Sequence, residues 1–170
     1  MATVTLKGNA CNLTGNEINV GDNAPQTTVV NSEGLADVVV GGTSDSVQLL
    51  VVVPSLDTPV CAAETRAFNE KASSIDGVTT TVISMDLPFA AGRFCTAEGI
   101  DNLTVASDFR NKDFANNYGV LIADGPLAGV TARAIFVVGK DGKVAYKQLV
   151  PEITAEPEYE EAIAAAKAAV

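Results

Sequence analysis

The sequence predicts an α/β protein with a mixed central sheet flanked by helices. Two observations lead to this fold class: short β-rich segments alternate with segments of helical spacing, and two late strands are joined by a Gly-containing turn. The alternation favours parallel strands, whereas the late hairpin adds an antiparallel pair, so a mixed sheet is expected. No internal repeat or linker divides the 170 residues, and a single domain spanning 1–170 is predicted.

The chain begins with a predicted β-hairpin within residues 1–18. Thr3–Lys7 alternates apolar and polar side chains, a Gly-Asn pair follows, and a second short segment contains Leu13 and Ile18. Three further strands are indicated by β-branched and apolar residues: Thr27–Val30, Val38–Val40 and Gln48–Val53. Pro54 ends the last and most apolar of them.

A helix is predicted from Thr58 to about Ser73. Its apolar and small residues recur at helical spacing and are expected to face the core: Val60, Ala63, Ala67 and Phe68. Its charged residues are available for the solvent-exposed face: Glu64, Arg66, Glu70 and Lys71. A β-branched strand is then expected at Thr79–Ser84.

A short helix that carries Cys95 is expected next. Asp86 has the side chain of a helix cap, Pro88 suits the first turn, and Gly99 offers a stop. The remaining elements complete the alternation: a strand near Leu103–Ala106, a helix around Lys112–Tyr118, strands at Ala134–Val138 and Lys143–Gln148, and a helix from about Pro157 to Lys167.

The composition excludes several classes of chemistry. The chain has no histidine, which rules out serine triads with a histidine base, Cys-His hydrolases, His-rich zinc sites and His-ligated haem. The net charge of −10 gives a surface that repels nucleic-acid backbones and acidic lipid headgroups. No apolar run approaches the roughly 20 residues that span a bilayer. Neither nucleic acid nor membrane is therefore an expected partner.

The N-terminal segment and the cysteine count indicate the compartment. No cationic stretch is followed by an apolar one at the N-terminus, so no secretory signal is predicted and a cytoplasmic location is expected. Cys11, Cys61 and Cys95 are too few for a disulfide scaffold, and no two of them form Cys-x-x-Cys. In a reducing compartment, a disulfide among them would be transient and chemical rather than structural.

Cys61 is the candidate nucleophile. Thr58 has the right side chain to cap the predicted helix and Pro59 suits its first position, so Cys61 falls in the first turn. Free backbone N–H groups and the helix dipole favour an anion there, which would make a nucleophilic thiolate without a histidine base. The alternative is a buried structural cysteine, which is common in proteins.

Two cysteine motifs carry a family pattern. Pro54-x-x-x-Thr58-x-x-Cys61 is followed by Arg93-Phe-Cys95. Five further segments add to the pattern: Asp86–Ala90, Phe109–Asn111, Ile122–Pro126, Ala132–Ala134 and Glu152–Pro157. Together these residues resemble the thiol peroxidase subfamily of the peroxiredoxins, the atypical two-cysteine kind, over nearly the whole chain.

This resemblance implies a thioredoxin-like fold with an added N-terminal β-hairpin. It also implies a two-electron reduction of hydrogen peroxide and organic hydroperoxides, in antioxidant defence, that uses no metal or organic cofactor. Cys61 would be the peroxidatic cysteine and Cys95 the resolving cysteine, joined after oxidation in an intrachain Cys61–Cys95 disulfide. Thr58 and Arg133 would complete the pocket, and Pro54 would shield the thiolate from water. Recycling by thioredoxin and a homodimer, with each active site inside one chain, are implied as well.

Physical chemistry is consistent with these roles. Attack on a peroxide builds negative charge on the departing oxygen, and Thr58, Arg133 and the first-turn N–H groups could donate to it. A disulfide needs Cα atoms within roughly 7 Å, yet both cysteines are expected on helices. Local unwinding around Phe94–Thr96, around Cys61, or at both is therefore predicted.

Other interpretations remain open from the residues alone. Arg133 could be a solvated strand end or part of an ion pair, and Cys95 a core thiol. The acidic stretch Glu152–Glu161 is expected to be a solvated loop and helix face, and Cys11 a bystander. A general thiol-disulfide oxidoreductase would normally have Cys-x-x-Cys. A non-catalytic thioredoxin-like binding protein would need neither Thr58 nor Arg133 in register.

Overall fold

Strand β5 (Val47–Val52) is the centre of the main sheet, and all six of its residues are buried. A strand covered on both faces needs apolar residues almost throughout, which its sequence supplies. It pairs in parallel with β6 (Val78–Ser84) and antiparallel with β9 (Ala134–Val138). The strands predicted at these three places are confirmed, with small differences at their ends.

Further strands extend the sheet on both sides. They are β3 (Thr27–Asn31), β4 (Asp37–Val40), β7 (Thr104–Ser107) and β10 (Val144–Leu149). The order across the sheet is β10-β9-β5-β6-β7-β3-β4, with the β5–β6 and β6–β7 pairs parallel and the others antiparallel. The predicted mixed sheet is confirmed. Because β5 and β6 run in parallel, the loops that follow them leave from the same edge of the sheet.

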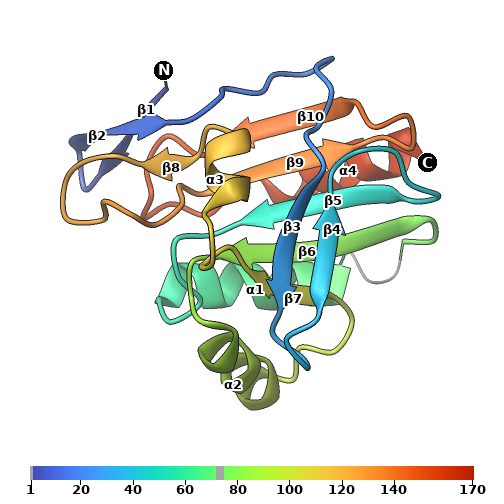
Figure 1. Cartoon of the computed structure of the whole chain (residues 1–170), viewed down its shortest axis with the longest axis horizontal. Helices are drawn as coiled ribbons and strands as arrows, with labels where there is room; N and C mark the ends of the chain where they lie inside the picture. The colour runs from blue at the N-terminus through green and yellow to red at the C-terminus, as the bar shows by residue number, and fades with distance from the viewer. Residues whose placement is uncertain (1, 72–74) are drawn as a thin grey trace.

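Helices cover the two faces of the sheet. They are α1 (Pro59–Lys71), α2 (Pro88–Glu98), α3 (Asp113–Asn117) and α4 (Tyr159–Ala169). Leu49 packs with Phe68 of α1 in one apolar cluster, and Leu50 packs with Phe114 of α3 in another. Since successive strand residues point to opposite faces, α1 and α4 lie on one face and α3 on the other (Figure 1).

The N-terminal hairpin lies at one end of the main sheet (Figure 1). Its strands β1 (Thr3–Leu6) and β2 (Asn9–Thr14) pair antiparallel, and β2 pairs with β8 (Leu121–Ile122) in a second, three-stranded sheet. Lys7 and Gly8 make the turn with φ of 50° and 82°, the positive values that a type I′ hairpin turn requires.

Some elements differ from the prediction. Strand β8 was not expected, because two residues carry no periodicity of their own and β8 forms by pairing with β2. Strand β2 ends at Thr14, so Ile18 lies beyond it and packs in the cluster under α3 instead. Helix α4 begins at Tyr159 rather than near Pro157, because Glu158 still has an extended backbone.

The computed structural model describes residues 2–71 and 75–170. The predicted end of the first helix, at Ser73, lies outside the described residues. Within the described ranges, no helix is long and apolar enough to cross a lipid bilayer.

Candidate active site

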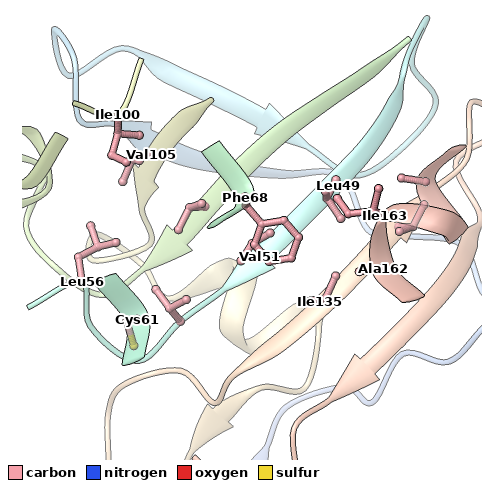
Figure 2. Packing of buried hydrophobic residues seen from close by; sticks show 14 of the residues in the cluster. Leu49, Val51, Leu56, Cys61, Phe68, Ile100, Val105, Ile135, Ala162 and Ile163 are labelled. Atoms are coloured by element: carbon pink, nitrogen blue, oxygen red, sulfur yellow. The ribbon is translucent and has the colours of Figure 1, made fainter. Parts of the chain in front are cut away.

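Cys61 lies in the first turn of α1, as predicted. The Ala62 N–H donates to the Thr58 carbonyl at 2.9 Å, so Thr58 occupies the N-cap position. Its hydroxyl, however, donates to the Ser55 carbonyl at 2.8 Å, which ties the cap residue to the preceding loop. Figure 2 shows Cys61 at the start of α1, at one end of the apolar cluster that extends to α4. The local sequence therefore places the sulfur where a helix favours an anion.

The prediction that Asp86 caps α2 is wrong. Leu87 is the N-cap residue and makes no side-chain cap hydrogen bond. The Asp86 carboxylate instead accepts from the Ser55 hydroxyl and the Leu56 N–H, both at 2.7 Å. It also accepts from the Ser84 hydroxyl at 2.8 Å. A carboxylate has room for several donors, and here they come from the end of β6 and the loop before α1. Asp86 thus fixes the loop that leads to Cys61.

Arg133, the residue before β9, lies beside Cys61. Its Nη1 donates to Cys61 Sγ at 3.2 Å and to Glu64 Oε2 at 2.6 Å. Arg133 is 2% exposed, and Cys61 and Glu64 are fully buried. Charge-assisted hydrogen bonds of this kind are short and strong away from water. The structure therefore brings together two residues singled out in the sequence and adds Glu64 as a third.

The backbone of Ile153 holds the other side of the guanidinium. Arg133 Nε and Nη2 donate to the Ile153 carbonyl at 3.0 and 2.8 Å. Burial by itself lowers the pKa of Arg133, but interactions with the Glu64 carboxylate and with the Cys61 side chain more than offset this effect and raise it. The guanidinium is therefore charged and fixed at several of its donors, with Nη1 directed at the sulfur.

The prediction that Glu64 faces solvent is wrong. The buried residues of α1 are Cys61, Glu64, Thr65 and Phe68. Glu64 lies three positions after Cys61, so both share one helix face, and that spacing was the available signal. Desolvation by burial raises the pKa of Glu64 to about 7, although Arg133 acts to lower it. Its Oε1 has no hydrogen-bond partner among the described residues.

Pro54 lies two residues after the end of β5 and is buried. The Thr131 hydroxyl donates to the neighbouring Val53 carbonyl at 2.8 Å, which ties the end of β5 to the segment before β9. Since proline has no N–H, this position offers no backbone donor to water or to a ligand. Pro54 therefore adds no hydrogen-bond donor at the buried start of the loop that leads to α1.

Cys95 lies in the second half of α2 and is half-buried. It lines a pocket of about 520 Å³ together with Ser32 and Glu33, from the turn between β3 and β4. Burial raises the pKa of the Cys95 thiol and Glu33 adds to the rise, whereas a hydrogen bond with the Ser32 side chain opposes it. Cys61 is not among the described residues that line this pocket, and both cysteines are free thiols. No disulfide joins Cys61 to Cys95, although both pack in the same apolar cluster.

The last turn of α2 closes on the backbone of Cys95. Gly99 ends the helix as predicted, with a φ of 67° in the left-handed region, and its N–H donates to the Cys95 carbonyl. The Ile100 N–H donates to the same carbonyl at 2.9 Å. These two hydrogen bonds fix the backbone of Cys95 at the C-terminal end of α2.

Cys11 is buried in β2. It packs in an apolar cluster with Val4, Leu13 and Ile122, and its Sγ donates to the Asn9 carbonyl at 3.7 Å. This environment is typical of a structural thiol. In the part of the chain that the structure describes, no group of three or more His, Cys, Asp or Glu is arranged to hold a metal ion.

The Cys61 site has the parts needed for attack by sulfur. A thiol at a helix N-terminus is in contact with a charged guanidinium, which can stabilise a thiolate. The same guanidinium can stabilise negative charge that develops on an oxygen bound beside the sulfur. These interactions are strong because water is excluded from the site.

Comparison with known proteins agrees with this chemistry. The Redoxin family model matches residues 19–163. The thiol peroxidase of Aquifex aeolicus is 56% identical over 161 residues, which are 95% of this chain and 94% of that protein. The thiol peroxidase of Leptospira interrogans is 53% identical over the full length of both chains.

Solved structures agree as well. The crystal structure of a peroxiredoxin-like protein from Aquifex aeolicus has a TM-score of 0.96 and 54% identity, and the match covers 100% of this chain and 98% of that one. A thiol peroxidase from Chromobacterium violaceum, at 24% identity, has the same fold, with a TM-score of 0.84 over 94% of this chain and 91% of that one. The predicted thioredoxin-like fold is confirmed. From the match to the Redoxin model and from the near full-length identity to two thiol peroxidases, the chain belongs to the thiol peroxidases of the Redoxin family.

Proposed function

We propose that this chain is a thiol-dependent peroxidase in which Cys61 reduces hydrogen peroxide and organic hydroperoxides. The observation that carries the proposal is the hydrogen bond from Arg133 Nη1 to Cys61 Sγ at 3.2 Å. A buried guanidinium so close to sulfur stabilises the thiolate and can donate to a peroxide as its O–O bond breaks. The family supports the same reaction, since its members in Aquifex aeolicus and Leptospira interrogans are called thiol peroxidases.

In the first step, the Cys61 thiolate attacks the terminal oxygen of the peroxide. An S–O bond forms, the O–O bond breaks, and its electron pair leaves on the alkoxide or hydroxide, which takes up a proton. The sulfur is oxidised by two electrons to a sulfenic acid, and the peroxide is reduced to an alcohol or water. Arg133 and first-turn N–H groups would donate to the reacting oxygens, and the Thr58 hydroxyl would do so after exchanging its hydrogen bond to the Ser55 carbonyl, while Pro54 would keep water away.

In the second step, the Cys95 thiol attacks the sulfenic acid sulfur. The S–S bond of the Cys61–Cys95 disulfide forms, and hydroxide leaves with the thiol proton as water. A disulfide requires Cα atoms within roughly 7 Å. Because Cys95 lies against the turn between β3 and β4, α2 would unwind around Phe94–Thr96, or the first turn of α1 would open.

A dithiol reductant then completes the cycle. Thioredoxin would attack the Cys61–Cys95 disulfide with a thiolate to form a mixed disulfide, and its second thiol would release both cysteines reduced while thioredoxin is oxidised to its own disulfide. The proposal includes a cytoplasmic homodimer whose active sites each lie within one chain, since both cysteines belong to the same subunit. Sedimentation equilibrium of the reduced protein tests the assembly: a mass of about twice the 17.5 kDa chain is expected, and a monomer would contradict it.

A turnover assay tests the function. Peroxide consumption with thioredoxin, thioredoxin reductase and NADPH is compared among wild type, Cys61→Ser, Cys95→Ser and Cys11→Ser. Turnover should be lost in the first two variants and nearly normal in the third, because Cys11 only packs in the core. Cys95→Ser should still consume one equivalent of peroxide per chain. Continued turnover by Cys61→Ser would overturn the proposal.

Two other functions have less support. A general thiol-disulfide oxidoreductase needs paired cysteines that exchange directly, whereas Cys95 lies in a separate pocket. A non-catalytic binding protein has no use for a buried arginine in contact with a cysteine, and a buried charge costs stability.

A further inference from the structure

Glu152 belongs to the acidic stretch that was expected to be solvated, yet it binds the N-terminal hairpin. Its Oε1 accepts from the Thr5 hydroxyl at 2.9 Å and from the Gly8 N–H at 3.0 Å. Its Oε2 accepts from the Thr154 N–H at 2.9 Å and the Thr154 hydroxyl at 2.7 Å. Hydrogen bonds from Thr154 and Gly8 hold the pKa of Glu152 well below its usual range. The carboxylate therefore joins the hairpin to the segment between β10 and α4.

The backbone makes the same connection. The Thr5 N–H donates to the Pro151 carbonyl at 2.7 Å, and the Ile153 N–H donates to the Thr5 carbonyl at 2.8 Å. The Ile153 side chain is buried in the apolar cluster of the hairpin, with Val4 and Leu13. The hairpin thus holds both the backbone N–H and the side chain of Ile153.

The other side of Ile153 faces the active site. Its carbonyl accepts both the Nε and the Nη2 hydrogen bonds of Arg133, whose Nη1 contacts Cys61 Sγ. Because the guanidinium is planar and rigid, the position of this one carbonyl sets the direction of Nη1. A continuous chain of short contacts therefore runs from the hairpin through Glu152 and Ile153 to Arg133.

From this chain of contacts, we propose that Glu152 is a positioning residue: with the N-terminal hairpin it holds the Ile153 carbonyl where Arg133 is aimed at Cys61. The inference rests on the proposed function, because it assigns a cause to the geometry of that site. It also gives the hairpin a part in the reaction, although no hydrogen bond joins its described residues to the sulfur. A small displacement of a group that stabilises a transition state can cost a large factor in rate.

The first arm of the test measures the second-order rate constant of Cys61 oxidation by hydrogen peroxide, by rapid quench and intact mass. Glu152→Ala should lower this constant about tenfold, since it removes all four hydrogen bonds to the carboxylate. Glu161→Ala is the matched control: its exposed carboxylate contacts only the Tyr146 hydroxyl among the described residues, and the constant should change less than about twofold. An unchanged constant in Glu152→Ala would overturn the inference.

The second arm separates positioning from a general loss of structure. If Glu152 acts through Arg133, Glu152→Ala should have an effect of less than about twofold when Arg133→Lys is already present. An equal tenfold loss in both backgrounds would mean a structural effect only, and would refute positioning. If Glu152→Ala does not fold, the same cycle is run with Glu152→Gln, which keeps the side-chain volume and is expected to lose about threefold.

Different results would refute the proposed function and the proposed role of Glu152. Oxidation of Cys61→Ser at the wild-type rate would refute the proposed function itself. Loss of oxidation in Cys61→Ser and Arg133→Lys, together with no effect of Glu152→Ala, would refute only the role of Glu152.

Discussion

Cys61 and Cys95 lie at opposite ends of their helices, and their surroundings differ accordingly. Cys61 is in the first turn of α1, fully buried, with a charged guanidinium at 3.2 Å. Cys95 lies seven residues into α2, near the negative end of the helix dipole, and burial together with Glu33 raises the pKa of its thiol. The first environment places a positive charge beside the sulfur, whereas the second disfavours ionisation of the thiol.

Because of this difference, the two proposed chemical steps depend on different parts of the molecule. Both helices start at the same edge of the sheet, but seven residues of helix place Cys95 about 10 Å along the α2 axis. In the proposed mechanism, Arg133 already contacts the reacting Cys61 in the reduced protein, whereas the second step requires a local change of structure that joins Cys95 to Cys61. Changes near Arg133 should affect the first step, and changes near the end of α2 the second.

The largest effect is expected at Arg133. Arg133→Lys keeps a positive charge for Glu64 but loses the planar donors that reach both Cys61 and Ile153. The rate constant for oxidation of Cys61 by peroxide should fall about 100-fold, as measured by rapid quench. Arg110→Lys, at an exposed arginine that pairs with Asp37, is the control and should change little. Equal rates in the two variants would contradict the assigned role.

The next effect concerns the charge of Glu64. Burial raises its pKa from 4.5 to about 7, so between these values the folded protein binds a proton that the unfolded chain has released. The contribution of Glu64 to stability is then fully present below pH 4.5 and is lost as the pH rises through 7.

Urea unfolding at several pH values checks this prediction. The free energy of unfolding of the wild type, relative to Glu64→Gln, should fall as the pH rises from about 5 to about 8. Glu161→Gln, at an exposed carboxylate on α4, should show no such change. A constant difference between wild type and Glu64→Gln would mean that Glu64 ionises like an ordinary carboxyl.

A smaller effect is expected at the end of α2. Gly99 has a φ of 67°, and alanine there costs about 1 kcal/mol, which should favour opening of the turn that holds Cys95. Gly99→Ala should therefore form the Cys61–Cys95 disulfide about fivefold faster after oxidation and leave the first step unchanged. Gly21→Ala is the control, because it introduces a similar backbone strain outside α2, at a φ of 95° with open space around the residue. Disulfide formation is followed by quenching with an alkylating agent and mass measurement, and a slower rate in Gly99→Ala would contradict the account.

The smallest effect is expected at Ser32. Its side chain lines the same pocket as Cys95 and acts to lower the pKa of that thiol, so Ser32→Ala should slow disulfide formation about twofold because less thiolate is available. Ser44→Ala, in the loop before β5, is the control. The same quenched reaction measures both variants, and a faster rate in Ser32→Ala would show that Ser32 instead holds Cys95 back.

Local signals in the sequence predicted most of the fold. The apolar run of β5, the proline at the start of α1 and Gly99 at the end of α2 each act through neighbouring residues, so their effects can be recognised without a structure. Strand β8 forms only by pairing with β2, more than 100 residues earlier in the chain, and no local pattern marks it.

Several residues of the functional site were also predicted from the sequence. Cys61 and its place in α1 follow from residues that are adjacent in the sequence, and the family motif supplied Arg133 and Cys95. Glu64 and Asp86 were misassigned because each has the local signature of another role, a surface residue and a helix cap. Their partners come from elsewhere in the chain: Arg133 lies 69 positions after Glu64, and Ser55 lies 31 positions before Asp86.

The central claim is that the Cys61 site is complete before Cys95 takes part, and one single-turnover measurement tests it most directly. Wild type, Cys95→Ser and Cys61→Ser are mixed with one equivalent of hydrogen peroxide and quenched at intervals. Because the chain has no tryptophan, intact mass rather than tryptophan fluorescence follows the oxidation. Cys95→Ser should lose its Cys61 thiol at the wild-type rate and accumulate the sulfenic acid, while Cys61→Ser stays reduced. Slow oxidation of Cys95→Ser, or rapid oxidation of Cys61→Ser, would contradict the account.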